Sequence, residues 1–178
     1  IIVYNCEPRP LYHATYVCFD LETTGLSSSY DEIIEFGAVK IQNGNEVARM
    51  QVFVKPEMTI PPLIEQKTNI TNAMVQNAEP ISVVIDRILD FIGDDILVAH
   101  NASFDLGFIQ EALRKLNRKP ITNPVIDTLP LSWVMFPERK RYALGYLVRG
   151  YKIEYDEEDA HRADYDAEVL SLAFIKML

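Results

Sequence analysis

Cysteine and long apolar runs are both scarce in this sequence. Only Cys6 and Cys18 occur, which excludes a disulfide framework and favours a reducing, cytoplasmic location. No apolar run approaches the ~18 residues that a membrane span requires, and the first residues lack the basic leader of a signal peptide. We therefore expect no membrane segment, and the length of 178 residues suits one globular domain.

Positive charge is also in deficit. The chain has 17 Lys and Arg against 26 Asp and Glu, which gives a net charge of −9. Strong affinity for nucleic acid is not expected from the chain alone, because Lys and Arg supply most nonspecific binding to phosphates. A nucleic-acid enzyme with this charge would contact few nucleotides, offset the repulsion with metal ions or be delivered by a partner. The basic cluster Arg139–Arg141 is typical of solvated surface.

The two ends of the chain suggest a fragment. There is no initiator Met, and the sequence stops at Leu178 inside a helical pattern. We expect a piece cut from a longer polypeptide, although proteolytic processing would look the same. Residues 1–14 show little periodicity and are interpreted as a leader or linker, so the expected domain covers residues 15–178.

Hydrophobic periodicity predicts an α/β fold. Apolar runs indicate strands, and Asn43-Gly44 between two of them is the strongest short-range hairpin signal. Later segments have helical spacing, clearest over Ile81–Ile92, which stands between Pro80 and Gly93. The expected strands cover Tyr16–Glu22, Ile33–Ile41, Glu46–Val54, Ile96–Ala99 and Val125–Ile126, and later helices are expected at 104–116, 129–135, 143–148 and 164–178. This order predicts a mixed sheet, with three early strands including a hairpin and two later parallel strands, flanked by helices.

Acidic side chains recur at the ends of predicted elements. Asp20 and Glu22 are two apart on a strand and project from the same face. Asp105 is expected in the first turn of a helix, and Asp166 at the start of the last helix near its packed side. His161 precedes that helix and could reach the same cavity. Read one by one, the acids fit a solvated loop for Asp20 and Glu22 and a plain helix cap for Asp105.

Taken together, these residues predict a metal centre for phosphoryl chemistry. Four carboxylates balance two divalent cations, and two such ions can clamp the attacking and leaving oxygens of an in-line displacement. An imidazole with a pKa near ~6.5 is suited to take a proton from water.

The same segments resemble the DEDDh group of DnaQ-like 3′→5′ exonucleases, which have a ribonuclease H-like fold. The resemblance runs from about Thr15 to the end and is greatest to the proofreading domain embedded in PolC-type bacterial replicative DNA polymerases. The matching stretches are Phe19–Leu26, Ile33–Glu35, Val98–Asp105, Ile126–Thr128, His161–Ala163 and Asp166–Ala167.

The resemblance implies roles for individual residues. Asp20, Glu22, Asp105 and Asp166 would hold two Mg²⁺ or Mn²⁺ ions, with His161 as the general base. The implied substrate-binding residues are Thr23, Thr24, Gly25, Leu26, Phe104, Asn101 and Thr68. Leu26 and Phe104 would pack against terminal bases, although both also fit a core position.

Two details complicate the substrate site. Relatives often carry Thr-Gly-Ile-Thr beside the terminal base, whereas this chain has Thr68-Asn69-Ile70-Thr71, and Asn tolerates the positive φ of such a turn. The matching residues His100, Asn101, Glu35 and Asp127 are also compatible with purely structural roles.

The predicted function is removal of 5′-mononucleotides from single-stranded or frayed DNA 3′ ends, as proofreading within a replicative polymerase. The expected partners are a DNA 3′ end and the rest of the polymerase chain and its replication machinery, and the isolated domain is expected to be a monomer. An exonuclease for RNA or oligoribonucleotides stays open as an alternative, and so does a non-catalytic binding module.

Overall fold

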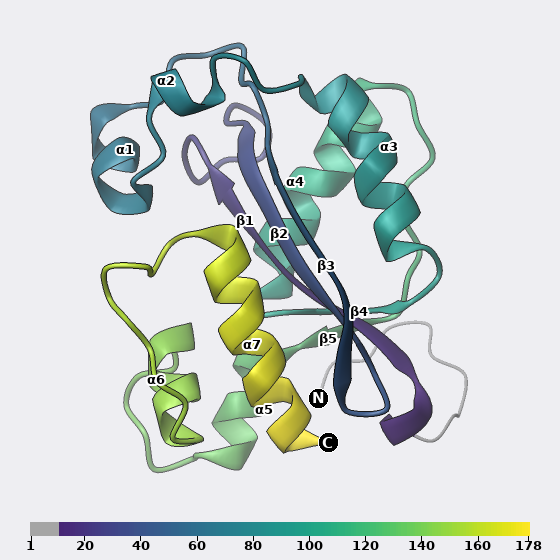
Figure 1. Ribbon diagram of the computed structural model, residues 1–178, viewed down its shortest axis with the longest axis vertical. Coiled ribbons are helices and arrows are strands. Elements are labelled where there is room, and N and C mark those ends of the chain that lie inside the picture. The colour runs from purple at the N-terminus through teal and green to yellow at the C-terminus, as the bar shows by residue number, and fades with distance from the viewer. Residues whose placement is uncertain (1–10) are drawn as a thin grey trace.

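The computed structural model of the chain (Figure 1) describes residues 11–178. Cys6 and most of the predicted leader lie outside these residues. Within them, no helix is long and apolar enough to cross a membrane.

The centre of the molecule is a five-stranded mixed sheet with the strand order β3-β2-β1-β4-β5. The first three strands pair antiparallel, whereas β1, β4 and β5 run parallel. The strands are β1 (Thr15–Thr23), β2 (Ile33–Gln42), β3 (Asn45–Phe53), β4 (Ile96–Ala99) and β5 (Val125–Asp127). The predicted sheet, with its early hairpin and two later parallel strands, is confirmed.

The β2–β3 hairpin closes through the predicted Asn-Gly turn. Asn43 has φ 50° and Gly44 has φ 71°, the positive values that a type I′ turn requires at both central residues. Because this turn follows the right-handed twist of the strands, it fixes their register.

Helices cover both faces of the sheet (Figure 1), with α3 and α4 on one face and α7 on the other. The helical segments are η1 (Leu11–His13), α1 (Pro62–Thr68), α2 (Asn72–Val75), α3 (Ile81–Ile92), α4 (Ala102–Lys115), α5 (Thr128–Met135), α6 (Leu144–Gly150) and α7 (Ala163–Met177). Helix α3 has the predicted bounds, with Pro80 as N-cap and Gly93 as C-cap.

Alternation along β1 decides which core each side chain enters. Val17 and Phe19 pack with α3 and α4, whereas Tyr16 and Cys18 pack with α7. Cys18 is fully buried, and burial raises the pKa of its thiol. Because strand side chains alternate, Asp20 and Glu22 continue the Tyr16–Cys18 row on the α7 side of the sheet.

The end of β1 has a strand neighbour on one side only. β2 pairs with β1 along its whole length, but β4 pairs with it only over Tyr16–Cys18. The last residues of β1 therefore lie where the sheet opens, beyond the carboxyl end of β4, the position at which parallel α/β sheets form ligand sites.

Gly37 sets how closely α7 approaches this open end. It pairs with Asp20 across the β1–β2 ladder, and a Cβ there would lie 2.1 Å from the carbonyl carbon of Ala163. Only glycine fits, because the opposing atoms are backbone and cannot rotate away. The missing side chain lets the first turn of α7 lie directly on the sheet.

We predict that Gly37→Ala destabilises the fold by about 1–3 kcal/mol or more, the usual cost of overpacking a core. Gly107→Ala is the matched control, because its nearest neighbouring atom is 3.8 Å away and alanine is about 1 kcal/mol better than glycine inside a helix. Denaturant unfolding of both variants checks the prediction. Equal stability of the two variants would contradict it.

Candidate active site

Two of the predicted acids lie in the last residues of β1. Glu22 is buried and Asp20 is half-buried. Burial raises the pKa of Asp20 well above its usual range, and the charges of Asp105, Asp166 and Glu22 raise it further. Burial and Asp166 raise the pKa of Glu22 to about 9. These two carboxyls are therefore in an environment that disfavours their charged forms unless positive charge is supplied.

Asp105 reaches the same place from the first turn of α4. That helix begins directly after β4, where Asn101 has a left-handed conformation with φ 73°. Asp127 fixes the turn, since its carboxylate accepts the N–H groups of Asn101 at 3.0 Å and Ala102 at 3.1 Å. Burial raises the pKa of Asp105 to about 8, although hydrogen bonds from the backbone of Asp105 and Leu21 oppose the shift.

Asp166 and His161 come from the start of α7 and the segment before it. The Tyr155 hydroxyl donates to Asp166 Oδ1 at 3.2 Å, and the His161 N–H donates to Oδ2 at 3.2 Å. Burial raises the pKa of Asp166 to about 6. Burial lowers the pKa of His161, and the charge of Lys67 lowers it further against the opposing effect of Glu157. The imidazole is therefore neutral at pH 7 and can accept a proton.

The structure groups three of the five predicted residues closely and places Asp20 and Asp105 near enough to interact with them through their charges. Ligand atoms of Glu22, His161 and Asp166 lie within 4.8 Å of one another, a spacing that suits a shared metal ion. Asp20 lies outside that triplet but feels the charges of Asp105, Asp166 and Glu22. The strand end, the α4 terminus and the α7 terminus thus lie near one another, while the site that these residues were predicted to form stays a prediction.

A buried ion pair holds the α7 terminus on the sheet. Glu35 is fully buried and accepts from the Arg162 guanidinium at 2.9 and 3.2 Å and from the Ala163 N–H at 3.0 Å. Gln51 donates a further hydrogen bond at 2.7 Å. Glu35 faces Glu22 across the β1–β2 ladder, so this anchor lies beside the cluster.

Sequence reasoning missed two side chains that act on the cluster. Lys67, near the end of α1, lowers the pKa of Glu22, Asp166 and His161 through its charge. Tyr155 hydrogen-bonds Asp166 from the segment before α7. No local sequence pattern marks either residue. For the Glu35 anchor a signal did exist, because its position between the apolar residues Ile34 and Phe36 indicates a buried charge, which needs a partner.

Four of the seven predicted substrate residues lie at the end of β1 and in the β1–β2 loop. The Thr23 hydroxyl donates to the Gly25 carbonyl at 2.6 Å, and the Thr24 hydroxyl accepts the Glu32 N–H at 2.9 Å. A Cβ at Gly25 would lie 2.4 Å from the Asp31 carboxylate, so a larger residue there would have to displace that side chain. This bonding gives the loop a fixed shape next to Glu22.

The other predicted substrate residues differ in accessibility. Leu26 is 83% exposed, which rules out the core position considered for it, whereas Phe104 is partly buried against Phe108. Asn101 is exposed beside the α4 terminus. Thr68 is buried, and its hydroxyl donates to the Ile64 carbonyl and accepts the Ile70 N–H. Its hydroxyl is therefore used within the fold.

Two residues around these sites have clear structural roles. Asn69 adopts φ 56°, so the turn after α1 keeps the left-handed conformation expected of it. His100 bonds the Thr128 hydroxyl at 2.9 Å and the Tyr142 carbonyl at 2.6 Å, which ties β4 to the segment before α6.

The cluster fits divalent cations. Hard cations prefer carboxylate oxygen, and four acids with raised pKa values are a set whose repulsion such ions would relieve. A ribonuclease H-like sheet that carries acids and a neutral imidazole at the open end of β1 defines a nuclease-type site.

The family model described as Exonuclease matches residues 17–174, and the chain belongs to this exonuclease family, which is dependent on divalent metal. It is 44% identical over 178 residues to the PolC-type DNA polymerase III of Bacillus subtilis, and 42% identical over 174 residues to that of Mycoplasma genitalium. These alignments cover 99% and 97% of this chain but 12% of each polymerase.

Solved structures agree with this fold. Exonuclease X in complex with 5′ overhanging duplex DNA is 27% identical, has a TM-score of 0.73, and aligns over 92% of this chain and 89% of that one. Exonuclease I of E. coli in complex with a dT13 oligonucleotide is 18% identical with a TM-score of 0.81, over 93% and 41% of the two chains. The second likeness shows the fold alone.

The raised pKa values predict how pH and metal act on stability. Folded-state values of about 6, 8 and 9 for Asp166, Asp105 and Glu22 exceed those of the unfolded chain, near ~4. Their contribution is fully present below that unfolded value and is lost as pH rises through the folded values. In chelator, the free energy of unfolding should therefore fall from pH 6 to pH 9, and Mg²⁺ or Mn²⁺ should restore more stability at pH 9.

Denaturant unfolding at both pH values, with chelator or metal, measures this effect. Asp105→Asn should weaken both the pH dependence and the metal response, whereas Asp90→Asn on the exposed side of α3 should leave both unchanged. A metal-induced gain of equal size at pH 6 and pH 9 would count against the prediction.

Proposed function

We propose that this domain hydrolyses the terminal phosphodiester of a DNA strand from its 3′ end and releases 5′-mononucleotides. The observation that carries the proposal is the grouping of Glu22, His161 and Asp166 at the open end of β1, with Asp20 and Asp105 close enough to act on it through their charges. Membership of the exonuclease family and similarity to PolC-type polymerases support the reaction and the choice of DNA.

We assign the four carboxylates to two divalent cations, Mg²⁺ or Mn²⁺. When bound, such ions lower the pKa of the attacking water and stabilise charge on the leaving 3′ oxygen. The chain supplies oxygen ligands from three separate elements, which fixes their positions relative to one another.

His161 is assigned the role of general base. Its lowered pKa leaves a neutral ring nitrogen near neutral pH, able to accept the proton from the attacking water. The hydrogen bond from its backbone N–H to Asp166 sets its position beside the ligands. Exposed Leu26, next to the rigid Thr23–Gly25 turn, is assigned to pack against the terminal base.

The biological setting is also a proposal. The chain spans 12% of the length of the polymerases it matches. We place residues 15–178 as a proofreading domain inside a cytoplasmic replicative polymerase, whose remaining chain delivers the DNA. Frayed 3′ ends are the expected substrate, since mismatches fray most readily.

Cleavage of a 5′-labelled single-stranded DNA oligomer with Mg²⁺ or Mn²⁺ tests the proposed reaction. The wild-type domain should give a ladder that shortens from the 3′ end and disappears in chelator. Asp20→Asn should abolish the ladder, and His161→Ala should slow it by roughly 10²–10⁴-fold, the usual contribution of a general base. His13→Ala and Asp90→Asn are matched controls, because both residues are exposed and outside the cluster.

Intact activity in His161→Ala would remove the base assignment. Release of labelled fragments longer than a mononucleotide from a 3′-labelled oligomer would contradict exonucleolytic release.

A comparison of DNA with RNA tests the choice of substrate. Initial rates on DNA and RNA oligomers of the same sequence should favour DNA, because the polymerase relatives act within DNA replication. Faster cleavage of RNA by the wild-type domain would overturn the choice of substrate while leaving the cluster chemistry intact.

A further inference from the structure

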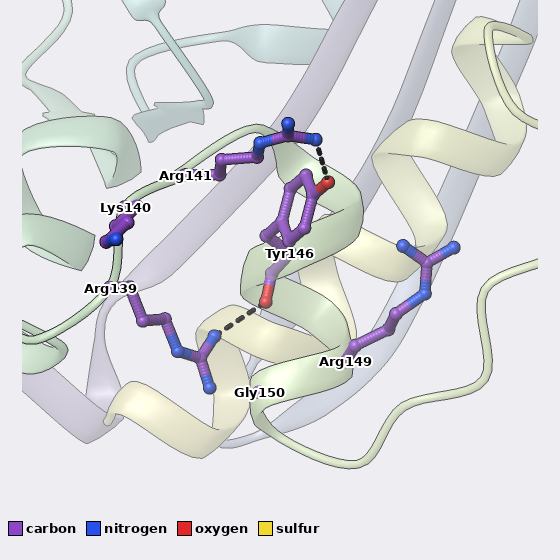
Figure 2. Close-up of a pocket in the computed structure, with 6 residues that line it drawn as sticks. All are labelled: Arg139, Lys140, Arg141, Tyr146, Arg149 and Gly150. Atoms are coloured by element: carbon purple, nitrogen blue, oxygen red, sulfur yellow. Dashed lines mark hydrogen bonds between the residues drawn. The ribbon is translucent and has the colours of Figure 1, made fainter.

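A basic patch lies between α5 and α6, apart from the carboxylate cluster. It consists of Arg139, Lys140, Arg141 and Arg149, with Tyr146 and Gly150, and these residues line an open hollow of about 480 Å³ (Figure 2). Four of the chain's 17 basic residues thus gather within one short stretch of a protein with net charge −9. This local excess opposes the overall charge.

The fold positions two of these guanidinium groups. Arg139 donates to the Tyr146 carbonyl at 2.7 Å, and Arg141 donates to the Tyr146 hydroxyl at 2.8 Å, so both converge on that residue (Figure 2). Arg139 also lies 4.1 Å from the centre of the Phe136 ring. A Cβ at Gly150 would lie 2.3 Å from the Arg139 guanidinium, so this glycine makes room for it.

The patch has uncompensated charge. Of the eight arginines within residues 11–178, six form ion pairs with carboxylates, whereas Arg139 and Arg141 form none there. Lys140 is exposed and also has no ion pair in the described part of the chain. Cations left unpaired in an acidic chain are suited to an anion supplied from outside.

A short path of contacts joins the patch to the carboxylate cluster. The Arg149 guanidinium lies 5.3 Å from the centre of the Tyr155 ring, and the Tyr155 hydroxyl donates to Asp166 at 3.2 Å. One aromatic side chain therefore separates the edge of the patch from a proposed metal ligand. A strand whose 3′ end lies at the cluster would have phosphates within reach of the patch.

We propose that the basic patch binds the phosphodiester backbone of the single DNA strand whose 3′ end enters the active site. The inference rests on the proposed function and adds the place where the strand lies upstream of the scissile bond. Arg139, Lys140 and Arg141 contact phosphates, and the half-exposed ring of Tyr146 offers a face for a base, a combination typical of single-strand binding.

Binding is measured by fluorescence anisotropy with a labelled dT20 oligomer in a His161→Ala background, so that the strand is not degraded. The patch variant is Arg139→Gln/Lys140→Gln/Arg141→Gln. The control is Arg87→Gln/Arg118→Gln/Lys119→Gln, which removes the same charge from exposed positions at α3 and beyond α4. Because both variants change the net charge equally, a difference between them reports position rather than long-range electrostatics.

The patch variant should bind dT20 at least 10-fold more weakly than the control. The slope of log affinity against log salt should fall by about 2, at about 0.7 for each phosphate that the variant no longer binds. Lys140→Gln/Arg141→Gln, which spares the packed Arg139, should show most of the effect if the triple variant fails to fold. Equal dT20 affinity in the patch and control variants would overturn the proposal. The anion that the patch binds would then be sought on the acidic surface of a partner protein.

Turnover of the otherwise wild-type chain separates this inference from the proposed function. The patch variant should raise KM for dT20 with little change in kcat, and should leave hydrolysis of a small aryl ester of thymidine 5′-phosphate unchanged. If the wild type cleaves no substrate, and the patch variant still loses dT20 binding, the proposed function is wrong and the patch proposal is kept. If the wild type cleaves DNA and the patch and control variants have the same KM for dT20, the patch proposal is wrong and the proposed function is kept.

Discussion

Mutual repulsion among four carboxylates is the constraint on which the rest of this structure depends. Two like charges ~4 Å apart cost roughly 4 kcal/mol at an effective dielectric of ~20, so a cluster of four competes with the whole net stability of a domain, about 5–15 kcal/mol. Burial is the main cause of the raised pKa values of Glu22, Asp105 and Asp166, and repulsion from neighbouring acids adds to it at Asp20 and Glu22, so all four favour their protonated forms. A metal-free fold therefore needs strong anchors on each contributing element.

The anchors lie next to the acids they hold. Gly37 lets α7 approach the sheet at the position opposite Asp20, and Glu35 binds the α7 terminus opposite Glu22. Glu35 is itself a buried acid in this neighbourhood, but Arg162, Gln51 and a backbone N–H satisfy it. Removing one partner of such a buried pair typically costs about 3–5 kcal/mol. Glu35 therefore differs from the four proposed metal ligands in having enough hydrogen-bond donors around its carboxylate.

Local sequence rules predicted the parts of the site but not every contact between them. The Asn43-Gly44 turn and the bounds of α3 follow from nearby residues, because turn dihedrals and helical periodicity are local properties. That Asp20, Glu22, Asp105, Asp166 and His161 meet could be inferred from the parallel-strand pattern and the family resemblance. The structure has them converge as expected, while their catalytic roles remain proposals.

The hydrogen bond of Tyr155 to the cluster and the effect of the Lys67 charge on it could not be predicted in this way. Each joins segments far apart in the chain or lies in an irregular stretch without periodicity, so no spacing rule applies. Thr68 shows that the family resemblance can also assign a role that the contacts of the side chain do not support. The resemblance marks it for the substrate, but in this fold its hydroxyl completes the end of α1, because a buried hydroxyl must be satisfied locally.

Charge distribution, rather than net charge, would reconcile an acidic chain with the polyanionic substrate that we propose. At physiological ionic strength the field of a surface charge is screened within about 8 Å, so distant acids on the far side of the molecule act only weakly on a bound strand. The proposed DNA strand would meet local charges: carboxylates that bound cations would neutralise, and Arg139 and Arg141, which form no ion pair within residues 11–178. In this proposal, affinity for DNA would depend on metal at the reacting end and on arginine along the backbone. Weak binding in chelator would then be compatible with productive binding when metal is present.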